Sequence, residues 1–173
     1  MEGKKWQDLK KSIKDVLSQI SDNSKDHLVS IINFSTKAII EYKYQKSDII
    51  DVESLTFFKG DGTNFCAVFD EAVLLMDNDV SDFSTFMVFM TDGQGSYPEE
   101  QIKKMKSIAT SLKFLKNQFK FFGLVFNAGK QEDEKTMKRI VLELGGEIKF
   151  AINGEELKKR YAEIFTKSLE NQK

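Results

Sequence analysis

The chain has 173 residues, of which 40% are hydrophobic and 31% charged, a composition typical of one globular domain with its own core. Its net charge is -1, and Arg139 and Arg160 are its only arginines. Because nucleic-acid-binding proteins commonly carry an excess of basic residues and several arginines, we do not expect a nucleic acid as the partner. No apolar run approaches the ~20 residues of a membrane span, charged residues follow Met1, and the single cysteine Cys66 has no internal disulfide partner. We therefore expect a cytoplasmic protein with no membrane partner.

The first half of the chain predicts two helices separated by a hairpin. Apolar residues recur at helical spacing over about residues 4–20. Two apolar runs, 27–34 and 38–42, predict a hairpin in which one strand is antiparallel. Residues 45–58 fit neither period and predict a short helix or an irregular connection, after which an apolar stripe from Phe65 to Met76 predicts the second helix.

The second half alternates between strands and helices. Residues 85–90 form an apolar run without alternation, as a strand covered on both faces does. Pro98 followed by two glutamates predicts a helix start, and that helix runs to about residue 116. The remaining predicted elements are a strand at 119–126, a helix at 132–144, a strand at 147–151 and a helix at 155–169.

The predicted order is α-ββ-α-β-α-β-α-β-α in a single domain, residues 1–170. This order predicts a doubly wound, Rossmann-like α/β fold with helices on both faces of a mostly parallel sheet and one antiparallel edge strand.

In such folds a central strand and its loop ordinarily precede the first helix, whereas this chain begins with the helix itself. We expect the first, central strand to be missing, which would make the chain an incomplete gene model or a remnant of low stability. Four large apolar side chains at ~1.5–3 kcal/mol each would account for ~6–12 kcal/mol of lost burial, against a typical domain stability of ~5–15 kcal/mol. The strand edges exposed in this way favour self-association.

Two loops are predicted where open parallel sheets bind ligands. Thr63 precedes the second helix, and Asp92 follows the strand at 85–90. A hydroxyl and a carboxylate are hard oxygen ligands suited to Mg²⁺, Mn²⁺ or Ca²⁺. The alternative is that Asp92 and Gly93 form a plain turn and that Thr63 caps the helix.

The same residues resemble a known family. Gly62-Thr63-Asn64-Phe65-Cys66-Ala67 resembles the second metal loop of von Willebrand factor A (VWA) domains, and Val88-Phe89-Met90-Thr91-Asp92-Gly93 resembles the third. Met1-Glu2-Gly3-Lys4-Lys5-Trp6 resembles the continuation of the first metal loop, without the aspartate-x-serine-x-serine segment that precedes it in the family. The resemblance also covers the antiparallel hairpin, the helix after Pro98, the strand Phe122-Gly123-Leu124-Val125 and the stretch from Gly145 to Ala151, so it involves essentially the whole chain.

The resemblance implies a module that binds another protein and is not an enzyme. Thr63 and Asp92 would be the surviving ligands of a metal-ion-dependent adhesion site, with Gly62, Asn64, Gly93 and Gln94 in the partner-binding loops. The implied cofactor is Mg²⁺ or another divalent cation, bound weakly or not at all, and its open coordination position would accept a carboxylate of the partner. The competing version is a metal-independent scaffold that binds through loop surface alone.

A second hypothesis, from a different functional class, is a phosphatase of the haloacid dehalogenase type, because residues 57–63 resemble the signature of these enzymes. Asp61 would be the acid/base of that site, but Lys59 occupies the position of the nucleophilic aspartate. Without a nucleophile there is no covalent phosphoryl transfer, and this reading ranks below the binding module.

Overall fold

The computed structural model describes residues 3–23, 27–56, 62–79, 84–91, 95–114, 118–126 and 131–170. Its elements follow the predicted order, with two short 3-10 helices, η1 and η2, in the connection at 45–58. They are α1 (Lys4–Asn23), β1 (Leu28–Phe34), β2 (Ala38–Lys46), η1 (Ser47–Ile49), η2 (Val52–Ser54), α2 (Phe65–Asp79), β3 (Thr85–Thr91), α3 (Glu99–Phe114), β4 (Phe119–Phe126), α4 (Gln131–Glu143), β5 (Glu147–Ala151) and α5 (Gly154–Glu170).

The strands that the structure describes form two sheets. Strands β3, β4 and β5 pair in that order and in parallel, whereas β1 and β2 pair with each other as an antiparallel hairpin. The prediction of an α/β fold with a parallel sheet, helices packed around it and an antiparallel hairpin is confirmed. The structure differs from the predicted single sheet, because no backbone ladder joins the hairpin to the parallel strands within the described residues.

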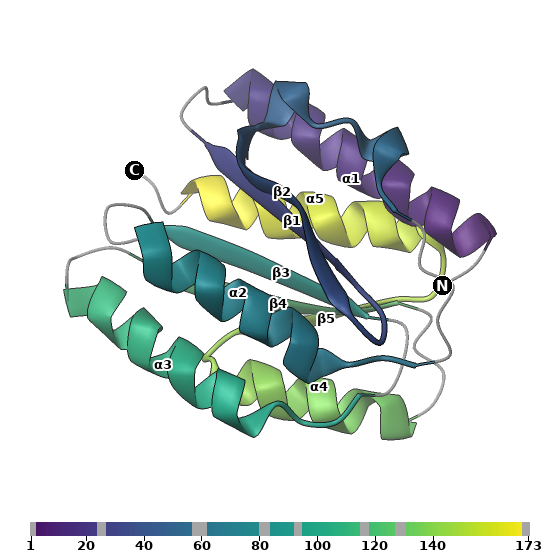
Figure 1. The fold of residues 1–173 in the computed structure, drawn as a ribbon. Helices are drawn as coiled ribbons and strands as arrows, with labels where there is room; N and C mark the ends of the chain where they lie inside the picture. Colours follow the sequence, from purple (N-terminus) through teal and green to yellow (C-terminus); the bar gives the residue numbers. More distant parts are fainter. Residues whose placement is uncertain are drawn as a thin grey trace.

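The helices cover the strands on both faces, as predicted. Helices α2, α3 and α4 lie on one face, and α1 and α5 lie on the other (Figure 1). Strand β4 is the middle strand of the parallel sheet, and its last six residues are all buried. None of the described helices has the length and apolar composition of a membrane span.

Phenylalanine rings fill the core between α2 and the parallel sheet. Phe65 and Phe69 of α2 each meet Phe89 of β3 edge to face, at centroid distances of 5.1 and 4.9 Å. Phe65, Phe69 and Phe121 are at most 1% exposed. These rings are among the largest fully buried side chains of the described residues, and they hold α2 against the sheet.

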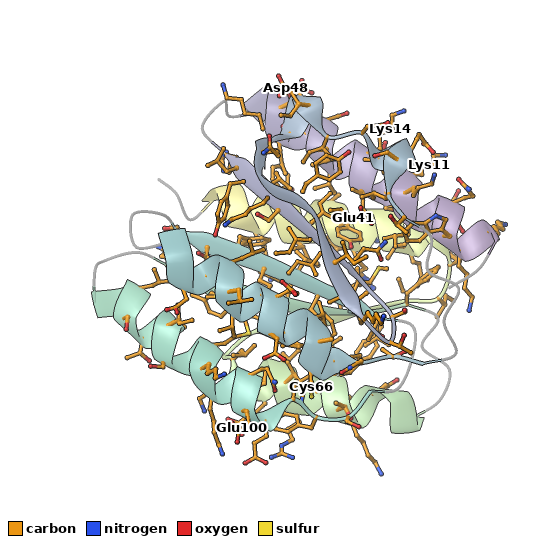
Figure 2. The ribbon with its side chains drawn as sticks, viewed as in Figure 1. Lys11, Lys14, Glu41, Asp48, Cys66 and Glu100 are labelled. Carbon is orange, nitrogen blue, oxygen red and sulfur yellow. The ribbon has the colours of Figure 1, made fainter. Side chains whose placement is uncertain are left out.

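Contacts with α1 hold the connection at residues 47–54, whose sequence has neither a helical nor a strand periodicity. Val52 is buried in a cluster with Leu17 of α1. Lys10 of α1 is only 8% exposed, and its ammonium group lies 2.6 Å from the Glu53 carboxylate. Other lysines of the same helix, among them Lys11 and Lys14, point outward (Figure 2).

Gly123 is a point of close approach between β4 and α4. A Cβ atom there would lie 2.6 Å from Val141 Cγ2 and 2.7 Å from Met137 Sδ. We expect Gly123→Ala to lower the free energy of unfolding by about 1–3 kcal/mol, because the core must shift to admit the methyl group. Urea denaturation followed by circular dichroism measures this. In a Val141→Ala background the same substitution should cost less, and an equal cost in both backgrounds would show that Val141 is not the obstacle.

Glu147 of β5 ties this strand to α5 through Lys167, with 2.7 Å between carboxylate and ammonium. This hydrogen bond holds the pKa of Glu147 below its ordinary value. A lowered carboxyl pKa stabilises the fold above the unfolded-state value, and the contribution is lost as the pH falls through the lowered pKa.

We expect Glu147→Gln to reduce stability at neutral pH by less than about 1 kcal/mol, since both side chains are about half exposed. The difference from wild type should shrink as the pH falls below 4.5, the ordinary value, and also in high salt. Thermal unfolding at several pH values measures it. A difference that grows toward acid would contradict the assignment.

Candidate functional site

The described flanks of the two predicted binding loops, residues 62–64 before α2 and Thr91 and Gly95 on either side of the second loop, lie at one edge of the fold. The parallel strands end there, the helices begin there, and the turn of the β1–β2 hairpin reaches the same edge (Figure 1). Loops at the carboxyl ends of parallel strands are placed side by side by the strands that carry them. The architecture therefore gathers segments that are far apart in the sequence.

The loop before α2 is fixed by Asn64. Its side-chain oxygen accepts a hydrogen bond from the Ala67 amide at 3.2 Å, which is the geometry of a helix N-cap. The Asn64 amide donates to the Ser35 carbonyl at 2.7 Å, and its side-chain nitrogen donates to the Thr36 carbonyl at 3.3 Å. Asn64, predicted as a partner-binding residue, thus joins the loop to the hairpin turn.

Thr63 therefore does not cap α2, and this part of the alternative is wrong. Thr63 is half-buried one position before the cap, next to exposed Gly62. A Cβ atom on Gly62 would lie 3.2 Å from Thr36 Cγ2, so the loop passes close to the hairpin turn here as well. The hairpin turn was not predicted as part of the site, because its sequence, Ser35-Thr36-Lys37, indicates only a turn.

The second predicted loop follows β3, which ends at Thr91, a residue only 3% exposed. Asp92, Gly93 and Gln94 lie outside the described residues. The chain resumes at Gly95, where a Cβ atom would lie 2.6 Å from the ring of Phe65, the first residue of α2. Phe65, which lies two residues after Thr63, and Gly95, which directly follows Gln94, are thus in contact. This contact brings the flanks of the two predicted loops together.

The start of α3 follows this loop and is held by α4. Pro98, predicted at the helix start, is buried, and α3 begins at Glu99. The Arg139 guanidinium lies 3.6 Å from the centroid of the Tyr97 ring, a cation–π contact. Burial raises the pKa of the Tyr97 hydroxyl, and the nearby Glu143 carboxylate adds to this. Neither Tyr97 nor Arg139 was predicted, because a contact between residues so far apart in the chain leaves no local sequence signal.

The two glutamates at the start of α3 are engaged elsewhere or point outward. Glu99 lies 2.9 Å from Lys103, and this hydrogen bond lowers the pKa of Glu99. Glu100 is exposed on the outer side of α3 (Figure 2). These positions suit carboxylates that stabilise the helix dipole, as expected from the sequence.

Comparison with known proteins agrees with this architecture. The von Willebrand factor type A domain matches residues 1–163. No curated protein matches the chain. A solved structure of an aerotolerance-related membrane protein from Bacteroides fragilis, carrying multiple mutations to serine, is 16% identical over 94% of this chain and 88% of that one, with a TM-score of 0.65.

Proximal thread matrix protein 1 from the mussel byssus is 12% identical over 92% of this chain, with a TM-score of 0.66. The present chain covers 42% of that protein. At these identities the two structures show the fold alone. The family match spans nearly the whole chain, and the chain belongs to the von Willebrand factor type A domain family.

Proposed function

We propose that this chain binds another protein through the loops at the carboxyl edge of its parallel sheet. VWA domains are generally non-enzymatic binding modules that commonly bind proteins. The observation that supports this site is the contact between Gly95 and Phe65, since it joins the flanks of the loops that carry Thr63 and Asp92. The Asn64 hydrogen bonds add the hairpin turn to the same surface.

Within this proposal, Thr63 and Asp92 would contribute to a divalent-cation site. A threonine hydroxyl and an aspartate carboxylate are the hard oxygen donors that Mg²⁺ prefers. Thr63 suits this role because Asn64, and not Thr63, serves the helix as its cap. A bound cation would supply a positive centre for a partner carboxylate, while Gly62, Gly93 and Gln94 would present backbone and amide groups around it.

Two versions of partner binding compete with this one. In a metal-independent scaffold, the same loops would bind through their surface alone. A second copy of the chain would bind through exposed strand edges, as unpaired backbone groups favour. The phosphatase alternative has no supporting observation, and Lys59 and Asp61 lie outside the described residues.

Magnesium binding tests the role of the two residues. Calorimetric titration should give a dissociation constant in the millimolar range or weaker, because one carboxylate and one hydroxyl leave most of the coordination shell to water. Thr63→Ala and Asp92→Asn should each weaken the binding further, whereas Thr110→Ala, which removes an exposed hydroxyl from α3, should leave it unchanged. Tight binding, or binding that ignores both loop substitutions, would contradict the proposed ligands.

Partner capture with and without EDTA separates the metal-dependent and metal-independent versions. We expect a protein captured by the wild-type chain to be lost in EDTA and lost with Asp92→Asn. Capture that survives EDTA but is lost with Gln94→Ala would favour the scaffold version. If capture is unaffected by EDTA and by every substitution in the two loops, the binding surface lies elsewhere and the proposal is overturned.

A further inference from the structure

The pair Asn153–Gly154 lies where β5 ends and α5 begins, and it is the only asparagine–glycine pair in the sequence. Strand β5 ends at Ala151 and runs parallel to β4, so the pair lies at the carboxyl edge of the parallel sheet. When glycine follows asparagine, the glycine nitrogen approaches the asparagine side-chain amide easily, because no Cβ atom hinders it. This pair is therefore the first place to look for a reaction between backbone and side chain.

Asp8 of α1 explains why position 154 holds a glycine. A Cβ atom on Gly154 would lie 2.5 Å from Asp8 Cγ and 2.6 Å from Asp8 Oδ2. Helices α1 and α5 pack along each other (Figure 1), so a larger residue at the start of α5 would displace the Asp8 side chain. The packing of α1 on α5 thus favours the reactive pair at this point of the chain.

Asn153 is the N-cap of α5. Its Oδ1 accepts a hydrogen bond from the Glu156 amide at 2.9 Å, and its carbonyl accepts one from the Leu157 amide, also at 2.9 Å. A nucleophile that attacks Cγ of an amide moves negative charge onto the amide oxygen. A donated hydrogen bond at a helix N-terminus stabilises that charge. The cap therefore polarises the Asn153 side chain for attack.

The attacking nitrogen and the leaving nitrogen are both free of hydrogen bonds. The Gly154 amide is the first N–H of α5, a position that has no partner within a helix. Within the described residues, neither this amide nor Asn153 Nδ2 donates a hydrogen bond. Asn153 is also exposed, so water reaches its side chain.

We propose that the folded chain modifies itself at Asn153 through a cyclic imide. The Gly154 backbone nitrogen forms a bond to Asn153 Cγ and the bond from Cγ to Nδ2 breaks. Nδ2 leaves as ammonia, which carries away the proton that the Gly154 nitrogen gives up. Water then opens the imide at either carbonyl, which leaves aspartate or isoaspartate at position 153. The sequence of steps needs water alone as a co-reactant.

The two products act differently on α5. Aspartate keeps a side-chain oxygen that can cap the helix. Isoaspartate places the Cβ atom in the main chain, which displaces the carbonyl that the Leu157 amide uses. Both products add a negative charge at the carboxyl edge of the parallel sheet. The reaction needs neither a cation nor a partner, so it stands apart from the proposed loop site.

Asn64 is a matched internal control, because it caps α2 in the same way. Its Oδ1 accepts a hydrogen bond from the Ala67 amide at 3.2 Å. Its Nδ2, however, donates to the Thr36 carbonyl at 3.3 Å, and the next residue is the bulky Phe65. The leaving group is thus held and the attacking nitrogen is hindered. Comparison of the two asparagines separates the effect of the cap from the effect of glycine and a free side-chain nitrogen.

Incubation of the full chain in a mildly alkaline buffer, followed by peptide mapping with mass spectrometry, tests the proposal. Conversion of the amide to an acid should accumulate at Asn153 at least about tenfold faster than at Asn64, because glycine leaves the attacking nitrogen unhindered. An isoaspartyl methyltransferase should label the same peptide, since direct hydrolysis of the amide gives aspartate alone. Asn153→Ser keeps a favourable N-cap and should abolish both signals.

A synthetic peptide of residues 147–158 is the unfolded reference, and circular dichroism of the incubated chain shows that it stays folded. If the peptide is converted while Asn153 of the folded chain stays intact, the cap protects this residue and the proposal is overturned. Faster conversion at Asn64 or at any other asparagine would overturn it as well. So would conversion of Asn153 without isoaspartate, or methyltransferase labelling that persists in Asn153→Ser.

Discussion

The packing of α1 across two separate sheets is the constraint on which the fold depends. Within the described residues no backbone ladder joins the hairpin to the parallel strands. Packed side chains hold these parts together, with the bond from the Asn64 amide to the Ser35 carbonyl at the hairpin turn. Trp6 and Ile13 of α1 pack on both parts from one face, and the Phe34, Phe65 and Phe89 rings join them from the other. The position of the hairpin turn beside the loop before α2, and hence the shape of the candidate site, follows from this packing.

The sequence predicts the elements well because their signals are local. The apolar stripe of α1 and the continuous apolar run of β4 each indicate their type without reference to the rest of the chain. The pairing of strands is less predictable, since it depends on distant residues. Strand β2 also runs to Lys46, beyond the predicted residue 42, across register irregularities where the Tyr44 amide donates to the Ser30 hydroxyl. The segment at 47–54 takes its form from α1, through contacts such as Lys10 with Glu53.

The candidate site is predictable only in outline. Spacing places Thr63 at a helix start and Asp92 at a strand end, and the structure brings the flanks of these loops into contact. The sequence alone does not indicate which residue caps α2, because Thr63 and Asn64 are adjacent and both residue types are favoured caps. Asn64 takes that role, with further bonds to the hairpin turn. Tyr97 and Arg139 are far apart in the sequence and come into contact only through tertiary packing, so no local sequence pattern predicts their contact.

The separation of the described strands into two hydrogen-bonded sheets has a kinetic consequence. The hairpin closes over a three-residue turn, a local event that takes on the order of 1–10 μs in isolated peptides. The parallel pairs β3–β4 and β4–β5 need an intervening helix before their strands meet, which places them among the slower, non-local steps. Folding should therefore form the hairpin early and independently, and α1 would join the two parts only in the final consolidation.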